Sequence, residues 1–400
     1  MNVLMVNKFL YPRGGAERCM LESGRMLEAC GHRVAYFGMA DARNAVGNPA
    51  GLYARPRDFH RRELRGPRYA LEILYSPDAR AKMRRVIEAF RPDVVHLHNI
   101  SFQLTPSVID AAWQAGVPVV QTVHDTQMLC PSHLMMNLRT GEPCDRCLTH
   151  GRLSCVRGRC IHGSLARSMI GAVEGALYAR LPQYDRVARY LCPSRYMQSL
   201  LLRVPRYAGK THLLPNYVSL PPVPSGCAKE RYVLYFGRLA VEKGIERMLE
   251  AFRLLPDVPL VVAGEGPLAP LVARCGLPNV RYVGFRDGEA LHRLIAQAAL
   301  TVCLPLWREN CPMAVIESLA LGTPVLGADS GGIPELIEDG VTGRLLSQIT
   351  PQSCAEAVAS LLGDEERLAA MSRACLESRK RAMTPDRYAR ALTEVYRSAR

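Results

Sequence analysis

Residues 1–20 read MNVLMVNKFLYPRGGAERCM, and this stretch decides the fold class. The apolar run VLMV at 3–6 is typical of a buried strand, and the Gly14-Gly15 pair that follows marks a turn. A helical pattern of apolar residues then runs from Ala16 to Cys30. A strand that enters a helix through a glycine turn begins a βαβ unit, so the opening predicts a parallel sheet flanked by helices.

The same alternation of strands and helices recurs in both halves of the chain. Further strand patterns lie at 34–38, 93–98, 118–124 and 190–194, and a second series lies at 232–237, 259–264, 280–284, 299–304 and 324–329. Two doubly wound domains of the α/β class therefore account for the 400 residues. Open sheets of this kind bind ligands at the carboxyl ends of their strands, so we expect two domains that face each other across a cleft.

Proline and glycine mark the division between the predicted domains. The stretch YVSLPPVPSG at 217–226 suits neither a helix nor a central strand. We therefore predict a first domain, a linker, a second domain and a C-terminal helix that packs back toward the first domain, at 1–215, 216–228, 229–380 and 381–400 respectively.

Positive charge is concentrated in the first half of the chain. The net charge is +14, and residues 1–200 hold 27 Lys and Arg against 16 Asp and Glu, whereas residues 201–400 hold 24 against 21. Such a field favours an anionic partner: nucleic acid, phospholipid or a phosphorylated substrate. The first apolar run is too short for a signal peptide, and no apolar window is long enough to span a bilayer, so a cytoplasmic location is expected.

Six short motifs follow one another along the chain: GGAER at 14–18, PN at 215–216, GRLAVEKG at 237–244, GEGP at 264–267, ENCPMAVIE at 309–317 and GGIPE at 331–335. In this order and spacing the chain resembles the retaining glycosyltransferases of family 4, whose two Rossmann-like domains form the GT-B fold. The resemblance implies transfer of a sugar from a nucleoside diphosphate sugar, a UDP-sugar or GDP-mannose, to a saccharide or lipid-linked acceptor. It also implies that catalysis needs no metal ion or other cofactor, that the first domain binds the acceptor, and that the process is assembly of cell-envelope or exopolysaccharide.

Two cations and two carboxylates carry the predicted chemistry of the second half. Arg238 and Lys243 lie at a strand end and in the loop after it, where both can stabilise the negative charge that a leaving diphosphate gains. No Asp-x-Asp pair accompanies them, so the two cations would replace a divalent metal. By resemblance, Glu309 would hold hydroxyls of the donor sugar and Glu317 would hold the ribose hydroxyls.

Backbone groups complete the predicted donor site. The amides of Cys311, Met313 and Ala314 lie at a predicted helix N-terminus, where they can meet phosphate or sugar oxygens. Asn216 belongs to the family motif before the linker. In the first domain, Gly15 ends the glycine turn, so its bare backbone can approach the donor phosphate and the acceptor.

Histidines end two of the predicted strands in the first half. His124 follows the apolar strand pattern at 118–124, and the resemblance implies that it contacts the transferred sugar. His96 and His98 also end a strand pattern, but they alternate along it, and a structural role is the alternative for them.

Five of the 14 cysteines fall between residues 130 and 160. The C-x-x-C spacing within this insertion, at about 130–162, suits a structural zinc site in a segment with little apolar periodicity. The predicted ligands are Cys144, Cys147, Cys155 and Cys160, with Cys130, His150 or His162 as replacements. An iron–sulfur cluster, a redox pair and simple reduced thiols remain the alternatives.

The same insertion is rich in arginine, and a helical pattern at 164–181 follows it. Because the first domain binds the acceptor in the family, this region is expected to receive a phosphorylated or lipid-carried acceptor at the inner face of an anionic membrane. The arginines are Arg139, Arg146, Arg152, Arg157, Arg159 and Arg167.

Three rival functions are compatible with parts of the sequence. A basic nucleic-acid-binding protein with a zinc-like cysteine cluster fits the charge, but aromatic residues are only 6% of the chain and do not interleave with the arginines. An NAD-dependent oxidoreductase fits the glycine turns, but no G-x-G-x-x-G follows the first strand. An inactive relative would not be expected to keep Arg238, Lys243, Glu309 and Glu317, so a glycosyltransferase without a nucleic-acid partner is the prediction.

Overall fold

The computed structural model describes residues 1–57, 66–137, 140–217 and 227–400. Most of the proline-rich stretch that we predict as a linker, residues 218–226, lies outside the described residues, as does Arg139.

The chain divides into two compact units. Unit 1 comprises Met1–Arg139, Cys144–Pro215 and Pro385–Arg400, whereas unit 2 comprises Thr140–Pro143 and Asn216–Thr384. Unit 1 is therefore discontinuous, because the last 16 residues return to it after the whole of unit 2.

Unit 1 is built on a six-stranded parallel sheet with the order β2-β1-β3-β4-β7-β8. The order reverses between β1 and β3, which makes this the switch point where doubly wound sheets bind ligands. The strands are β1 (Asn2–Val6), β2 (Arg33–Phe37), β3 (Val94–Leu97), β4 (Val119–Thr122), β7 (Val187–Cys192) and β8 (Thr211–Leu213), and a short strand β5 (Met136–Asn137) lies outside the sheet.

Helices cover this sheet and extend from it. The helices of unit 1 are α1 (Gly15–Ala29), α2 (Gly66–Leu74), α3 (Pro77–Phe90), α4 (Ser107–Gln114), α5 (Arg146–Thr149), α6 (Leu153–Gly158), α7 (Leu165–Arg180), η1 (Gln183–Arg186), α8 (Arg195–Leu202), α9 (Pro205–Ala208) and α16 (Pro385–Ser398). Helix α3 packs its buried face, which includes Met83, Val86 and Phe90, into the main core with Leu4 and Val95 of the sheet.

The C-terminal helix α16 packs within unit 1, where it contacts α1. Its buried residues Tyr388, Leu392 and Tyr396 recur every four positions and so form one apolar face. The hydroxyl of Tyr396 lies 2.7 Å from Nδ1 of His96 in β3, a contact between residues 300 positions apart in the chain. This helix therefore supports the central strand of the sheet directly.

Unit 2 contains a second six-stranded parallel sheet, with the order β11-β10-β9-β12-β13-β14. This is the strand order of dinucleotide-binding domains, and its switch point lies between β9 and β12. The strands are β9 (Glu230–Phe236), β10 (Leu260–Ala263), β11 (Val280–Gly284), β12 (Ala298–Cys303), β13 (Val325–Ala328) and β14 (Gly343–Leu346), and the short strand β6 (Glu142–Pro143) also belongs to this unit.

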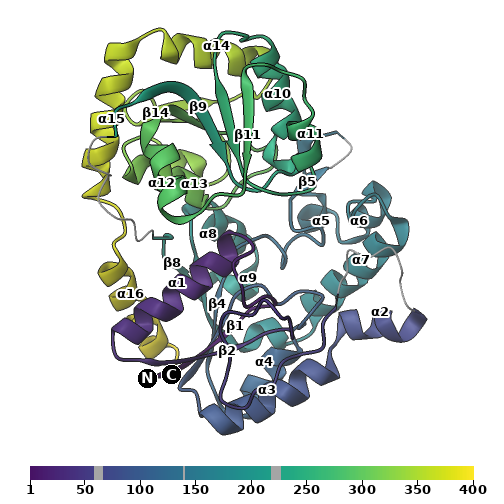
Figure 1. Ribbon diagram of the computed structural model, residues 1–400. Coiled ribbons are helices and arrows are strands. Elements are labelled where there is room, and N and C mark those ends of the chain that lie inside the picture. The colour runs from purple at the N-terminus through teal and green to yellow at the C-terminus, as the bar shows by residue number, and fades with distance from the viewer. Residues whose placement is uncertain (58–65, 138–139, 218–226) are drawn as a thin grey trace. The chain divides into compact units, whose positions relative to one another are not determined.

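Alternate residues of β9 face two different helical layers. Val233 and Tyr235 pack with α10 and α14 on one face of the sheet, whereas Leu234 and Phe236 pack with α12 on the other. Figure 1 shows these layers. The helices of unit 2 are η2 (Val241–Lys243), α10 (Ile245–Arg253), α11 (Ala269–Ala273), α12 (Gly288–Gln297), α13 (Met313–Ala320), η3 (Ile333–Glu335), α14 (Pro351–Leu362) and α15 (Glu365–Arg379).

The two doubly wound α/β domains predicted from the sequence are confirmed by these sheets. The edge strands β8 and β14 were not among the predicted strands, because they are short and, unlike the equally short central strands, only partly buried, so they lack an apolar run. Within the described residues, no helix combines the length and the apolar character that crossing a membrane requires.

Candidate functional site

The loops that follow β9 and β12 meet at the switch point of unit 2. Lys243, at the end of η2, forms an ion pair with Oε1 of Glu309. The indole Nε1–H of Trp307 donates to the same oxygen at 2.9 Å, and the ammonium of Lys243 lies 5.4 Å from the centre of the Trp307 ring. Two residues predicted from the sequence are thus brought together, and Trp307 is a third member of the cluster that no sequence signal indicated.

This ion pair is largely withdrawn from solvent. The side chain of Lys243 is 27% exposed and that of Glu309 is 9% exposed. Burial by itself disfavours the charge on Lys243, but the charge of Glu309 and the hydrogen bond to it raise the pKa of Lys243 above the usual lysine value. Lys243 therefore stays protonated at neutral pH and offers a fixed positive charge at the carboxyl edge of the sheet.

Arg238 follows β9 at the same edge and is more open to solvent. Its side chain is 60% exposed, and its guanidinium is 3.9 Å from the Glu242 carboxylate. Its backbone carbonyl accepts a hydrogen bond of 2.9 Å from the hydroxyl of Tyr235, which anchors the loop while leaving the side chain exposed. Arg238 and Lys243 thus place two cations on the loop after one central strand.

Two glycines let the loops after β10 and β13 come close to the loops after β9 and β12. A Cβ on Gly264, after β10, would lie 1.9 Å from the carbonyl oxygen of Gly237. A Cβ on Gly331, after β13, would lie 2.2 Å from the carbonyl oxygen of Glu309, and its φ of +66° is itself unfavourable for other residues. The amide of Gly332 donates to that Glu309 carbonyl at 2.8 Å, so the glycine pair holds Glu309 in place.

Helix α13 carries the remaining predicted donor contacts. It begins at Met313, and the amides of Met313 and Ala314 stand in its first turn, ahead of the bond that Val315 donates to Pro312. Cys311 is buried just before the helix, and its carbonyl accepts a bond of 3.1 Å from Nδ2 of Asn216. Glu317 lies inside α13 and is 2% exposed.

The carboxyl edge of the unit 1 sheet holds a second polar group at its own switch point. Nδ2 of Asn7, after β1, donates to Oε1 of Glu17 in α1 at 3.3 Å, and Oδ1 of Asn7 accepts from the amide of Asn99, after β3, at 2.9 Å. Gly15 is the first residue of α1 and is exposed, so its backbone is accessible at this edge. The contacts of Asn7 and Glu17 were not predicted.

Three histidines meet on the neighbouring strands of unit 1. Nδ1 of His98 lies 2.8 Å from Nε2 of His124, and the two rings stack with centroids 5.1 Å apart. His96 is held between Thr122 and Tyr396, each 2.7 Å from a ring nitrogen, which is the structural role considered for it. Nε2 of His98 is buried and has no partner among the described residues.

Burial keeps these imidazoles neutral. It lowers the pKa of His96 to about 3 and that of His124 to about 4, and it lowers the pKa of His98 well below the usual value, with the neighbouring histidines adding to the effect on His96 and His98. A neutral His124 has one ring N–H that can donate and one ring nitrogen that can accept, but it cannot serve as a permanent cation.

The cysteine-rich segment of unit 1 brings four thiols together in two pairs. The Cys147 thiol donates to Cys130, which lowers the pKa of Cys130 to about 5 and raises that of Cys147. The Cys155 thiol likewise donates to Cys160, which lowers the pKa of Cys160 and raises that of Cys155. Within the described residues Cys144, one of the predicted ligands, takes no part in these pairs.

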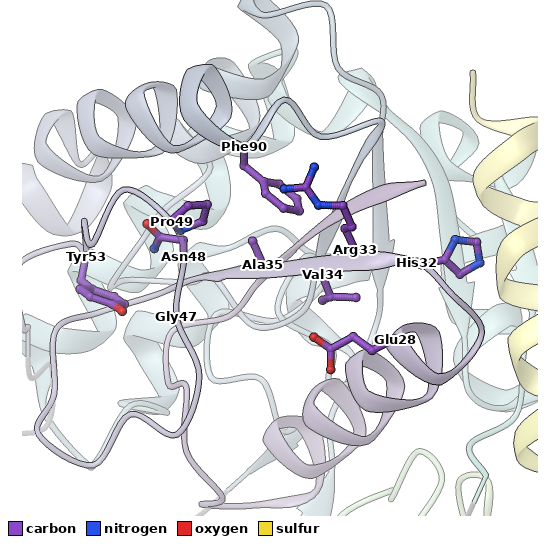
Figure 2. Close-up of a pocket in the computed structure, with 10 residues that line it drawn as sticks. All are labelled: Glu28, His32, Arg33, Val34, Ala35, Gly47, Asn48, Pro49, Tyr53 and Phe90. Carbon is purple, nitrogen blue, oxygen red and sulfur yellow. The ribbon is translucent and has the colours of Figure 1, made fainter.

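A separate hollow of about 560 Å³ lies beside β2, the edge strand of unit 1. Figure 2 shows that its lining residues come from α1, β2, the end of α3 and the loop near residue 48. They include Glu28, His32, Arg33, Asn48, Tyr53 and Phe90. No predicted site residue lines it, and Val34 and Ala35 place it along the strand rather than at its carboxyl end.

Two doubly wound domains, with a buried Lys–Glu pair at the switch point of the second, define a two-domain α/β protein of the nucleotide-binding type. The model of Glycosyltransferase Family 4 matches residues 13–220, more than half of the chain, and the model of Glycosyl transferases group 1 matches residues 225–377. The chain belongs to this glycosyltransferase family, which confirms the resemblance found in the sequence.

Individual relatives share moderate identity with the chain. It is 28% identical over 301 residues to the D-inositol 3-phosphate glycosyltransferase of Segniliparus rotundus, covering 72% of this chain and 62% of that protein. It is 35% identical over 154 residues to the alpha-D-kanosaminyltransferase of Streptomyces kanamyceticus, covering 34% of this chain and 40% of that protein. The matches thus span less than two thirds of these relatives' own length.

Among solved structures, Anabaena HepE in complex with UDP-glucose matches with a TM-score of 0.69 at 19% identity, over 100% of both chains. Sucrose-phosphate synthase of Thermosynechococcus elongatus matches with a TM-score of 0.71 at 17% identity, over 99% of this chain and 98% of that one. At these identities the likeness concerns the fold, and it confirms the two Rossmann-like domains.

Proposed function

We propose that the protein transfers a sugar from a nucleoside diphosphate sugar to an acceptor hydroxyl. The observation that carries the proposal is the Lys243–Glu309 pair, with Arg238 on the same loop, at the switch point of unit 2. The names of the similar proteins support it, because both curated relatives are glycosyltransferases and one similar structure holds UDP-glucose.

The two cations suit the charge that this reaction develops. As the bond from the anomeric carbon to the phosphate oxygen breaks, its electron pair leaves with the diphosphate, which gains negative charge. Lys243 and Arg238 stabilise that charge, and a preorganised donor in a water-poor site acts most strongly where charge develops. The proposed reaction therefore needs no divalent metal or other cofactor.

Glu309 is placed to hold the donor sugar. Both of the described hydrogen bonds to its side chain, from Lys243 and Trp307, use Oε1. Within the described residues Oε2 is left for a substrate hydroxyl. Glu317 would hold the ribose, while the amides of Cys311, Met313 and Ala314 would meet donor oxygens, with Asn216 fixing the Cys311 loop.

We further propose that the transfer retains the configuration of the sugar. The acceptor oxygen bonds to the anomeric carbon from the face that the diphosphate leaves, and its proton passes to a departing phosphate oxygen. His124 and the backbone of Gly15 would contact the transferred sugar, the phosphate and the acceptor. A UDP-hexose is the first candidate donor, ahead of GDP-mannose, and cell-envelope polysaccharide assembly is the proposed process.

Ligand-induced stabilisation tests this proposal directly. UDP or GDP at a hundred times its Kd should stabilise the protein by about 2.7 kcal/mol, which raises the Tm by roughly 5 °C or more. The measurement is thermal unfolding of the full chain with UDP, GDP, their sugars, NAD and an oligonucleotide, each with and without EDTA. A rise in Tm with one nucleoside diphosphate that persists in EDTA is expected. It identifies the nucleotide that carries the donor sugar.

Other results of the same panel favour the rivals. A shift with NAD and none with UDP or GDP would point to the oxidoreductase, and a shift with the oligonucleotide alone would point to the nucleic-acid-binding protein. A UDP or GDP shift that EDTA abolishes would contradict metal independence while preserving the transferase.

We also propose that unit 1 contacts an anionic membrane, at the inner face of the cell membrane, to reach a lipid-linked acceptor. Leu165, Met169 and Val173 are spaced four residues apart on α7 and are 48%, 50% and 51% exposed, so they form one apolar stripe. Exposed arginines of α5 and α6, Arg146 and Arg157, belong to the preceding segment. Apolar insertion and attraction to anionic headgroups are the two contributions that hold peripheral helices on membranes.

Replacing the three stripe residues together with serine is expected to weaken binding to phosphatidylglycerol vesicles by about a hundredfold, since each lost apolar contact is worth about 1 kcal/mol. Co-sedimentation with anionic and zwitterionic vesicles measures this. Leu202→Ser, at an equally exposed residue of α8, is the matched control. Equal binding by the triple variant and the control would remove the membrane contact from the proposal.

A further inference from the structure

Trp307 lies in the loop after β12, two residues before Glu309. Its side chain is partly buried. The backbone of this loop is fixed against the loop after β9, because the amide of Leu306 donates to the carbonyl of Glu242 at 2.9 Å. The indole is therefore held beside Lys243 by a contact of the main chain as well as by its own side-chain contacts.

The indole of Trp307 contacts both members of the buried ion pair. Its Nε1–H donates to Oε1 of Glu309 at 2.9 Å, and the Lys243 ammonium, which pairs with the same oxygen, lies 5.4 Å from the centre of the ring. That distance is within the range of a cation–π contact. The three side chains therefore form a closed set in which each contacts the other two.

Nothing in a glutamate side chain by itself decides which of its two oxygens faces a ligand. The last torsion of this side chain is broad and roughly two-fold, so a carboxylate that is held by one donor can turn and exchange its oxygens. Two donors on Oε1 of Glu309, from Lys243 and Trp307, oppose that rotation. Within the described residues neither bond uses Oε2, so the donors that hold Oε1 leave Oε2 directed away from them.

The backbone of Glu309 is fixed independently of Trp307. The amide of Gly332 donates to the Glu309 carbonyl at 2.8 Å, and Gly331 lies too close to that carbonyl for a Cβ to fit. The Glu309 side chain is also mostly buried, so packing restricts its rotamers. The orientation of the carboxylate plane is the part of Glu309 that these contacts do not fix and that Trp307 does.

We propose that Trp307 is a positioning residue for the donor sugar: its indole N–H, together with Lys243, orients the Glu309 carboxylate so that Oε2 accepts a hydroxyl of the transferred sugar. This inference rests on the proposed function of the Lys243–Glu309 site. Its effect should be confined to the sugar, because the diphosphate is held by Lys243 and Arg238. A hydrogen bond to a charged acceptor is stronger than one between neutral groups, so losing the N–H has a measurable cost.

Trp307→Phe tests the role of the N–H, since phenylalanine keeps an aromatic ring beside Lys243 but has no donor. The free nucleotide should bind within about twofold of the wild-type affinity, whereas the nucleotide sugar should bind about tenfold more weakly and kcat/KM should fall by about 10- to 100-fold. Calorimetry gives the two Kd values. The ligands are the nucleotide sugar that produces the largest thermal shift and the free nucleoside diphosphate of the same base.

Trp307→His is the conservative variant that should restore the hydrogen bond. Nε2 of an imidazole occupies the position of the indole Nε1 on a five-membered ring and can donate when it carries the proton. Most of the affinity for the nucleotide sugar should therefore return. Trp113→Phe is the matched control, the same substitution at a residue of unit 1 that is 55% exposed, and it should change neither Kd.

A second measurement leaves Trp307 intact. The chain has two tryptophans, so in ¹⁵N-labelled Trp113→Phe the remaining indole N–H resonance belongs to Trp307. The nucleotide sugar should move this resonance more than the free nucleotide does, because only the sugar adds a hydrogen bond to the carboxylate that accepts the N–H. This comparison tests the inference even where Trp307→Phe does not fold.

The outcomes separate this inference from the proposed function. If the wild-type chain binds no nucleoside diphosphate sugar, the proposed function fails and the inference fails with it. If the wild-type chain binds one, and Trp307→Phe keeps the same preference for it over the free nucleotide, the positioning role alone is overturned. Equal weakening of both ligands, no recovery in Trp307→His, or an indole resonance that responds equally to both ligands would overturn it too.

Discussion

Replacing Lys243 with methionine is expected to lower the rate of sugar transfer by about 10² to 10³-fold, the usual effect of removing one group that stabilises charge in a transition state. The variant also leaves Glu309 as a buried carboxylate without its ionic partner, which costs about 3 to 5 kcal/mol of stability. Activity and stability must therefore be measured together, as kcat/KM for the nucleotide sugar that gives the largest thermal shift and as the Tm of the same preparation.

A second substitution separates the two effects. In Lys243→Met with Glu309→Gln, no charge is left unpaired, so stability should largely return while activity stays low. The exposed pair Lys380 and Glu377, 2.7 Å apart, provides the matched control, because its removal should change neither quantity noticeably. Recovery of activity in the double variant would show that the buried pair serves the fold and not the reaction.

Unit 1 is expected to lose stability as the pH falls from 7 to 5. His96, His98 and His124 have folded-state pKa values below the usual 6.5, so their contribution is fully present above pH 6.5 and is lost as the pH falls toward their folded values. With pKa values of about 3 and about 4, His96 and His124 together account for a loss of about 4 kcal/mol over this range.

One buried carboxyl group opposes this loss. Burial raises the pKa of Glu174 from 4.5 to about 7, so protonation of Glu174 stabilises the folded state as the pH falls. Its contribution between pH 7 and 5 is about 2 kcal/mol. Since His98 acts in the same direction as the other histidines, the net loss is about 2 kcal/mol or more, equivalent to a fall in Tm of roughly 4 to 8 °C.

The chain has two tryptophans, Trp113 in unit 1 and Trp307 in unit 2. They allow the loss of stability between pH 7 and 5 to be measured for unit 1 by itself. In Trp307→Phe, fluorescence-detected unfolding reports unit 1 alone. Glu174→Gln should enlarge the loss of stability between pH 7 and 5, and His98→Asn should reduce that loss. His150→Gln, at an exposed position, should leave the loss unchanged. A stability that stays level or rises toward pH 5 would contradict burial of neutral histidines.

The sequence indicated which loops meet at the carboxyl edge of the unit 2 sheet, because their residues lie in short, local motifs. Arg238 and Lys243 share one loop, and the strand patterns on either side place that loop and Glu309 at the same edge. Parallel sheets bring the carboxyl ends of their strands together, so the strand patterns place Lys243 and Glu309, 66 positions apart, at one edge. The ion pair between them was not predicted.

Contacts made by side chains of distant segments could not be predicted in this way. Trp307 bonds to Glu309 because of the path of one loop, and no periodicity encodes that path. The stacking of His98 on His124 depends on strand register, which a single residue of slip would alter. The cysteine pairs likewise join Cys130 to Cys147 across an irregular stretch, where C-x-x-C spacing alone favoured Cys144.

The return of the chain to unit 1 has a consequence for its biosynthesis. His96 leaves the ribosome 300 residues before Tyr396, its hydrogen-bonding partner. At roughly 5 to 20 residues per second, about 15 to 60 s of translation separate the two. Through that interval β3 is already made but α16 is not, so the buried His96 lacks its Tyr396 partner and α1 lacks the helix that packs against it. The nascent chain would then be most exposed to chaperones and proteases while unit 2 is still being synthesised.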